Sequence, residues 1–582
     1  MSDSGATIKR IHSVILSAAH RYAISIGIAI VASVITNTQA IAQMALKADS
    51  LVRIANDPEL VEFALTLPLR NQSELQRNIA SMYDAKSRQF RHFLSVAEFQ
   101  DKYAPSPAQY AALRQFAVDS GLTIVRELAG RTSIDVSGNV ATVRSLFNVQ
   151  MYWRQAADGR NYLWADKEPT PSAGLASIGG NAAVLRQRPP APLVRYSGGT
   201  ATGAPNAGTG PGGNYVPGDI RTAYNLNTIQ NGGTPVALYE LSTASYSDAG
   251  VYASTYGLNN PTLTQKSVGA SPGAVAPDEV MLDIEMVMAV SNPTNIYIYT
   301  GNSSSTGPLD TYQQIANDNL VGQVSSSWYT GCESDVGAST MNAENTVFTQ
   351  MVAQGMAVFI AQGDEGAYNV SSVNCVTGTG IGPQVLDPAS QPYVTSAGGT
   401  TLTTSSTQAY VSESVWNDLS TTPPHGATGG GVSSYWSIPS YQVGLTASSS
   451  TMRNVPDMSL NADPLTGYYI YCSTCTGGPW LTGMGGTSAV APQLAAFWSL
   501  VSKGLGTRAG FANPTLYKLA IATTSYTSDF HDITSGNNGY YSASAGYDNA
   551  TGLGSYNGAN LYTAVVQFKR AGLIPITSLL LQ

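Results

Sequence analysis

Residues 43–190 combine two patterns of apolar positions. Two stretches have apolar residues at helical spacing and two are strand-like runs, namely 73–82 and 107–120, then 122–127 and 132–136. Ser106 followed by Pro107 is a favoured combination of an N-cap and a first helical residue. This part of the chain is therefore predicted to be an α+β domain.

From residue 214 onward the pattern changes to strand-like runs that alternate with helical stretches. The strand-like runs lie at 236–241, 296–299, 321–325 and 357–360. The helical stretches lie at 279–289, 343–353 and 492–501. This alternation favours a parallel sheet with helices on both faces, so the second part is predicted to be of the α/β class.

Further segments lie outside these two domains. In residues 1–42, basic residues precede the apolar run 23–35, and Ala40-Ile41-Ala42 has the small-x-small pattern of a cleavage site, which predicts a secretory signal peptide. The alternative is a membrane anchor, but the run is short for a span. Residues 191–213, rich in Pro, Gly, Ala, Thr and Asn, are expected to be an unpacked linker that proteases reach easily and that contains the processing site. The predicted organisation is therefore a signal peptide, a first domain, a linker, a second domain and a C-terminal tail, at 1–42, 43–190, 191–213, 214–572 and 573–582.

Charge is scarce and unevenly distributed. Charged residues make up 11% of the 582 positions and the net charge is −8, which argues against nucleic acid as a partner. Residues 1–200 carry a net charge of +6, and the rest carries −14. Between Lys266 and Arg453 there are 14 carboxylates and no Lys or Arg. Some of these carboxylates must be exposed, bound to a cation or protonated at the working pH.

The clearest candidate nucleophile is Ser488. It follows Gly486-Thr487 and precedes an apolar helical stretch, so it is either an ordinary N-cap or a nucleophile that needs a base within hydrogen-bond reach. Of the five histidines only His425 and His531 lie in the second domain, and neither has the sequence context of a subtilisin base. A Ser-His-Asp mechanism is therefore poorly supported.

Carboxylates are the alternative base. Glu279 and Asp283 lie four positions apart among apolar residues, so one helix face presents both. Such a pair is either a solvated stripe or a general base with a partner, and adjacent like charges favour sharing one proton. Asp364 follows the apolar run 357–360, which predicts a place at the carboxyl end of a parallel strand, either as a turn residue or as part of a ligand site.

Together these motifs resemble the sedolisin/kumamolisin family of serine-carboxyl peptidases, which includes the tripeptidyl peptidases. The main matching motifs are Glu279-x-x-x-Asp283, Gly363-Asp364 and Gly486-Thr487-Ser488-x-x-x-Pro492. Other matches are Ala223-Tyr224-Asn225-Leu226, Arg453-x-Val455-Pro456-Asp457 and Asn513-Pro514-Thr515-Leu516-Tyr517. The first domain resembles the family's pro-domain through Phe93-Leu94-Ser95, Glu98-Phe99 and Tyr103-Ala104-Pro105. The likeness spans nearly all of residues 60–572 and implies a subtilisin-like catalytic domain behind a ferredoxin-like pro-domain.

The resemblance also implies roles for individual residues. Ser488 would be the nucleophile, Glu279 the base and Asp283 the partner that orients the base. Asp364 would be the acid that stabilises the oxyanion. Two further positions match those at which kumamolisin-like members extend the proton network, Glu240 and Trp328.

A metal site and disulfides complete the expected sites. The family has one structural Ca²⁺ ion per catalytic domain, and the matching ligands are the carboxylates and carbonyl oxygens of Asp532, Ile533, Ser544, Gly546 and Asp548. The alternative is an ordinary Asx-rich turn. For the four cysteines we expect structural disulfides, with the pairing Cys332–Cys375 and Cys472–Cys475 as one of three connectivities. The alternative for Cys472 and Cys475 is half of a redox or zinc site.

The leading hypothesis is an exported, acid-active endopeptidase that processes itself. The basic pro-domain would act as an intramolecular inhibitor, and the mature enzyme would be an extracellular or periplasmic monomer that cuts proteins or peptides and does not span the membrane. Carboxyl groups suit an acid optimum because an imidazole is almost fully protonated at pH about 4. The alternatives are a tripeptidyl aminopeptidase of the same family, a neutral Ser-His-Asp hydrolase, and a binding protein that has kept the fold.

Overall fold

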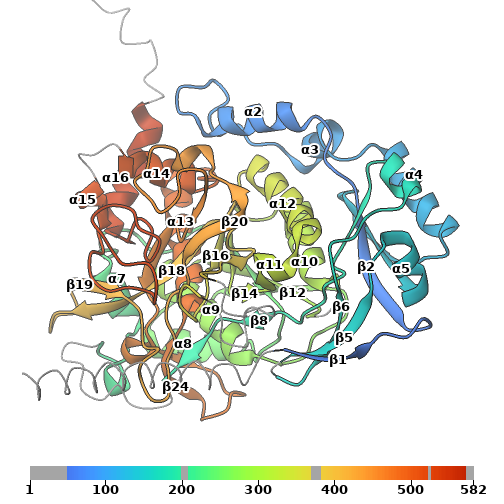
Figure 1. The fold of residues 1–582 in the computed structure, drawn as a ribbon. Helices are drawn as coiled ribbons and strands as arrows, with labels where there is room; N and C mark the ends of the chain where they lie inside the picture. Colours follow the sequence, from blue (N-terminus) through green and yellow to red (C-terminus); the bar gives the residue numbers. More distant parts are fainter. Residues whose placement is uncertain are drawn as a thin grey trace, which may run out of the picture.

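The computed structural model describes residues 49–156, 158–197, 208–303, 305–368, 382–521 and 526–571. The predicted signal peptide and the tail from 573 lie outside these ranges. Figure 1 shows the N-terminal domain, in blue and cyan, along one side of a larger C-terminal domain. Among the described helices, none combines the length and apolar character that a membrane crossing requires.

The N-terminal domain is built on a four-stranded antiparallel sheet. Its order is β3(Thr123–Glu127), β4(Ser133–Asn139), β2(Leu60–Thr66), β7(Asn181–Ala183). The principal helices between these strands are α2(Gln72–Tyr83), α3(Val96–Lys102), α4(Pro107–Asp119) and α5(Val140–Phe147). A second sheet joins β1(Ser50–Ile54), β5(Met151–Gln155) and β6(Asn161–Ala165). The succession of strands and helices, with the strand order of the first sheet, is that of a ferredoxin-like domain, so the α+β prediction is confirmed.

The predicted N-cap at the start of α4 is present. The Ser106 hydroxyl accepts from the Gln109 N–H at 3.2 Å, and the Gln109 side chain accepts from the Ser106 N–H at 2.9 Å. With Pro107 as the first residue of α4, the helix begins where the sequence indicated.

The C-terminal domain is built around a parallel sheet. Its parallel strands, in spatial order, are β11(Thr262–Val268), β12(Asn295–Gly301), β10(Val236–Glu240), β13(Gln323–Ser326), β16(Ala357–Ala361), β18(Thr395–Thr404) and β22(Met458–Asn461). β19(Tyr410–Val415) pairs antiparallel with β18. Alternate residues of β10 belong to different apolar clusters. One cluster contains α9(Pro277–Val290) and α13(Val490–Leu505), and the other contains α10(Gly307–Asp318) and α12(Ala338–Ala353). Helices therefore cover both faces of the sheet, as predicted.

The segment after the N-terminal domain differs from the sequence prediction. Residues 191–213 were expected not to pack, but within them β8(Ala191–Pro192) pairs with β14(Trp328–Tyr329), and β9(Arg195–Tyr196) pairs with β24(Trp480–Gly485). Both pairings are antiparallel. The prediction was wrong for residues 191–196. Strand pairing uses main-chain N–H and C=O groups, and a segment of linker-like composition carries these groups as well.

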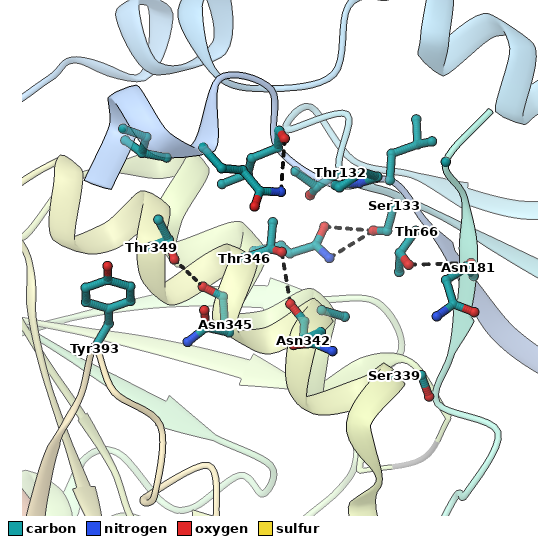
Figure 2. A pocket seen from close by; sticks show the side chains of 18 of the residues that line it. Thr66, Thr132, Ser133, Asn181, Ser339, Asn342, Asn345, Thr346, Thr349 and Tyr393 are labelled. Carbon is teal, nitrogen blue, oxygen red and sulfur yellow. Dashed lines mark hydrogen bonds between the residues drawn. The ribbon is translucent and has the colours of Figure 1, made fainter. Parts of the chain in front are cut away.

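The boundary between the two domains is only partly filled. Tyr83 of α2 donates to the Val352 carbonyl at 2.8 Å and accepts from the Phe511 N–H at 3.0 Å. Farther along the boundary, between β2 and α12, lies a cavity of about 370 Å³ that polar side chains line (Figure 2). At its edge the Ser133 hydroxyl and the Gln313 amide exchange hydrogen bonds of 2.9 and 3.0 Å. A boundary with such a polar gap is easier to separate than a domain core, which is close-packed.

Candidate active site

The candidate residues meet at the carboxyl ends of three neighbouring strands. Glu240 is the last residue of β10, Trp328 follows β13, and Asp364 follows β16. Side chains at this edge of a parallel sheet commonly form ligand sites. α9 contributes the remaining carboxylates, and the turn before α13 contributes Ser488. All six residues singled out by the sequence are buried.

Ser488 and Glu279 form the central pair. The Ser488 hydroxyl donates to Glu279 Oε2 over 2.9 Å. Ser488 lies in a short 3₁₀ turn, Thr487–Ala489, directly before α13. Gly486 before this turn has φ +87°, and a Cβ there would lie 2.2 Å from the Leu193 carbonyl oxygen and 2.5 Å from Asp364 Oδ2. Only glycine fits this position, because both its backbone conformation and its surroundings exclude a side chain.

Behind this pair the carboxyl groups form a hydrogen-bonded chain. Asp283 accepts from the Ser327 hydroxyl at 2.8 and 3.0 Å and also hydrogen-bonds with Glu240. Trp328 Nε1 donates to Glu240 Oε2 at 3.0 Å. Ser327 was not among the predicted site residues, although it directly precedes Trp328 in the same strand-end segment.

Burial and mutual repulsion act in the same direction on these acids. Burial raises the pKa of Glu279, Asp283 and Glu240 well above the usual range. The charge of Asp283 raises the pKa of Glu279 and Glu240 further. The group therefore holds protons that separate carboxyl groups in water would release, in line with the predicted proton sharing.

Asp364 faces Ser488 from another side. Its Oδ1 accepts from the Thr487 N–H at 2.8 Å and from the Thr487 hydroxyl at 2.7 Å. Its Oδ2 lies 3.5 Å from Arg195 Nε, and the same guanidinium is hydrogen-bonded to Glu365. Burial raises the pKa of Asp364 to about 6, although Arg195 and Thr487 oppose the shift. Sequence reasoning gave no role to Thr487 or Arg195.

The two candidate histidines do not join this site. His425 Nδ1 lies 3.0 Å from the Thr421 hydroxyl, and the His531 ring packs against Tyr410 with a centroid distance of 3.6 Å. Glu279 occupies the hydrogen-bonding position beside Ser488 that a histidine base would need. The geometry therefore gives no support to a Ser-His-Asp arrangement.

Asp532 and Asp548 are brought together by the loop between them. Asp532 accepts from the Gly546 N–H at 3.0 and 3.1 Å, and Asp548 accepts from the Ser544 N–H at 3.0 Å. In the described part of the chain, neither carboxylate forms an ion pair with Lys or Arg. Two carboxylates without a cationic partner, both held by the main chain of residues 544–546, offer the hard oxygen atoms that Ca²⁺ takes as ligands, so the chemistry of these side chains fits the ion.

The cysteines are oxidised where the structure describes them. Cys472 and Cys475 form a disulfide, which is one of the two expected pairings. Cys332 is also disulfide-bonded, while Cys375 lies outside the described residues. Cys472 and Cys475 are therefore not a pair of free thiols.

Comparisons with known proteins agree with this geometry. Residues 50–178 match the family described as pro-kumamolisin, activation domain. Kumamolisin of Bacillus sp. (strain MN-32) is 31% identical over 537 residues, which cover 86% of this chain and 91% of kumamolisin. Sedolisin of Pseudomonas sp. (strain 101) is 29% identical over 525 residues, with 86% of each chain covered.

A solved structure extends the likeness to three dimensions. Pseudomonas sedolisin, complexed with two molecules of pseudo-iodotyrostatin, matches with a TM-score of 0.56 and 29% identity, covering 62% of this chain and 99% of that one. This match, together with the relatives above and the buried serine and carboxyl cluster, establishes the class of enzyme. The chain belongs to the sedolisin/kumamolisin family of serine-carboxyl peptidases and carries an N-terminal activation domain of the pro-kumamolisin type.

Proposed function

We propose that this chain is an exported, acid-active serine-carboxyl endopeptidase that is made as a self-processing zymogen. The observation that carries the proposal is the 2.9 Å hydrogen bond from Ser488 to a buried Glu279, in a cluster that holds no histidine among its described members. In this proposal Ser488 is the nucleophile and Glu279 the general base. Asp283 and Glu240 act on Glu279 as positioning residues.

The proposed reaction follows from these contacts. As Ser488 Oγ adds to the substrate carbonyl carbon, its proton moves to Glu279, which acts as base while it is the ionised member of the proton-sharing cluster. The negative charge that develops on the substrate oxygen faces the Ser488 N–H and a protonated Asp364, which donate hydrogen bonds to it. The peptide C–N bond then breaks, Glu279 returns the proton to the leaving amine, and water hydrolyses the acyl-enzyme by the same route.

The proposed acid dependence has a defined sign. Asp364 donates to an oxyanion only while it is protonated, and its pKa lies at about 6. The donor is therefore present below about pH 6 and is lost as pH rises through this value. Above it, an anionic Asp364 would repel the intermediate.

Endopeptidase action is favoured over tripeptidyl action by the course of residues 188–196. A tripeptidyl peptidase needs a substrate groove that closes three residues before the cut bond. Here the chain runs past Ser488 as β8 and β9, and it continues on the N-terminal side through Pro190 and the buried Arg188. This course supports a substrate groove that is open on both sides of the cut bond.

The same segment supports the zymogen part of the proposal. It lies over Ser488, which is fully buried in this form, and the Arg195 guanidinium pairs with Asp364 and Glu365. Acid protonates Asp364, which weakens the ion pair and creates the oxyanion donor at once. A separate ion pair joins the two domains themselves, from Arg126 to Asp310 at 3.4 Å.

The pH profile on two peptides tests the proposal. Between pH 2.5 and 8 we expect hydrolysis to peak below pH 5 and to fall steeply above pH 6. A peptide with an acetylated N-terminus should be cut internally at a rate similar to its free-amine control, because an endopeptidase does not need the amine. Full activity at pH 8 would contradict the carboxyl mechanism, and cleavage of the free-amine peptide alone, in steps of three residues, would favour the tripeptidyl alternative.

We also propose that Asp532 and Asp548 hold one structural Ca²⁺ ion. The ion would neutralise the two carboxylates and tie their loop to the domain. At a calcium concentration of about 100 Kd the bound ion contributes about 2.7 kcal/mol, so EGTA should lower the apparent Tm by on the order of 4 °C in a domain of this size.

Excess Ca²⁺ should restore the Tm of the wild type, and Mg²⁺ should not, because Mg²⁺ demands a tighter octahedral site. The Asp548→Asn variant should lose most of its response to EGTA. A wild-type Tm that is the same with EGTA and with Ca²⁺ would count against the site.

A further inference from the structure

Residues 191–196, which cover the active site, pair with neighbouring strands at both of their ends, as a bound peptide would. On the N-terminal side, Pro192 lies opposite Trp328, and Ala191 lies opposite Tyr329, in antiparallel register. On the C-terminal side, Arg195 lies opposite Gly485. Figure 1 shows β8 beside β14, on the side of the C-terminal domain that is nearer to the N-terminal domain.

Leu193 lies between these two pairings and is held by its own main chain. Its N–H donates to the Ser327 carbonyl at 3.1 Å. Its carbonyl oxygen accepts from the Ser488 N–H at 3.4 Å. Proline is tolerated at 192 because the ladder uses the N–H of the next residue instead.

The Leu193 carbonyl oxygen also faces Asp364. A Cβ atom placed on Gly486 would lie 2.2 Å from this oxygen and 2.5 Å from Asp364 Oδ2. Asp364 Oδ2 is buried and makes no hydrogen bond within the described part of the chain. The peptide carbonyl of Leu193 thus accepts from the Ser488 N–H and lies near Asp364, and these are the two proposed oxyanion donors.

The side chain of Leu193 is enclosed more than those around it. It is 2% exposed and belongs to the largest apolar cluster of the C-terminal domain. The other residues of 191–197 are half-buried or exposed. Leu193 is therefore the most deeply buried side chain in the described part of this segment, and the subsite that holds it is apolar.

We infer that the enzyme first cuts its own chain at the Leu193–Val194 bond, and that the subsite holding Leu193 selects an aliphatic residue in other substrates as well. The inference rests on the proposed function and adds the bond and the side-chain preference. Ser488 Oγ adds to the Leu193 carbonyl carbon and Glu279 takes its proton. The Leu193–Val194 C–N bond breaks, the proton passes to the Val194 nitrogen, and water releases a pro-domain that ends in Leu193.

The first test follows the precursor after a shift from pH 8 to pH 4. Intact-mass spectrometry and N-terminal sequencing at successive times should find Val194-Arg195-Tyr196 as the earliest new N-terminus, before any trimming. An earliest cut at another bond would overturn the inference. If casein is still degraded in that case, the proposed function stands, whereas a chain that cuts neither casein nor itself from pH 2.5 to 8 refutes both.

The second test separates selectivity from folding of the precursor. Mature enzyme is given peptides with the sequence of residues 188–197, carrying Leu, Met or Asp at the position of Leu193. Leu and Met should be cut before the Val with similar kcat/KM, and Asp at least about 100-fold more slowly, because a carboxylate would lose its hydration in an apolar subsite. Equal rates for Leu and Asp, or cutting elsewhere in the Leu peptide, would overturn the inference.

Discussion

Replacing Ser488 by Ala is expected to abolish peptide hydrolysis and self-processing together. Without Oγ no acyl-enzyme forms, and the hydrogen bond to Glu279 is lost with it. Removing the nucleophile of a comparable serine peptidase lowers kcat by about 10⁶-fold. The measurement is casein hydrolysis at pH 4, with gel analysis of the precursor after the same acid shift.

The control is Ser254→Ala, which removes an exposed hydroxyl from α8(Asp248–Tyr256) and should leave both activities unchanged. The Ser488→Ala precursor should remain full length and serve as a substrate for wild-type enzyme added in trans. Rapid self-processing of the purified Ser488→Ala precursor would contradict the role given to Ser488.

Replacing Asp364 is expected to have the second large effect on activity, and the Asp364→Ala and Asp364→Asn variants should differ in kcat/KM. Asp364→Ala removes the proposed oxyanion donor and should lower kcat/KM by about 10²–10³-fold at pH 4. In Asp364→Asn, the amide oxygen should take the place of Oδ1, because the Thr487 N–H and hydroxyl both donate there. The amide NH₂ then faces the substrate oxygen in place of Oδ2.

An amide donates at every pH, whereas a carboxyl donates only below its pKa. Asp364→Asn should therefore retain more activity than Asp364→Ala at pH 4, and its kcat/KM should fall less between pH 5 and 7 than that of the wild type. The comparison is made on a peptide that is cut in all three proteins. If Asn were as inactive as Ala at pH 4, the donor role of Asp364 would be refuted.

These experiments test a site whose parts were predictable to different degrees. The helical spacing of Glu279 and Asp283 follows from four positions in sequence, and α9 does present both to the site. Asp364 after an apolar run predicted a strand end, and β16 ends three residues before it. Local patterns suffice in these cases because the periods of helices and strands are themselves local.

The contacts of Asp364 and Glu240 could not be predicted in this way. Arg195 lies 169 positions before Asp364, and Trp328 lies 88 positions after Glu240. The sequence separation within such pairs carries no signal, because the connections that bring these segments together have no fixed length above the dozen or so residues that a parallel crossover needs. The strand order decides which residues meet.

The sequence by itself determined the two fold classes, and it predicted a boundary near 190 and the principal site residues, because these follow from local patterns and short motifs. Tertiary structure alone decided that residues 191–196 thread the active site. Their composition predicts a linker, and a linker strand is held by main-chain groups that every residue possesses. It was likewise the tertiary structure that aligned Leu193 with Ser488, because that alignment depends on the register between a short strand and two distant strand ends.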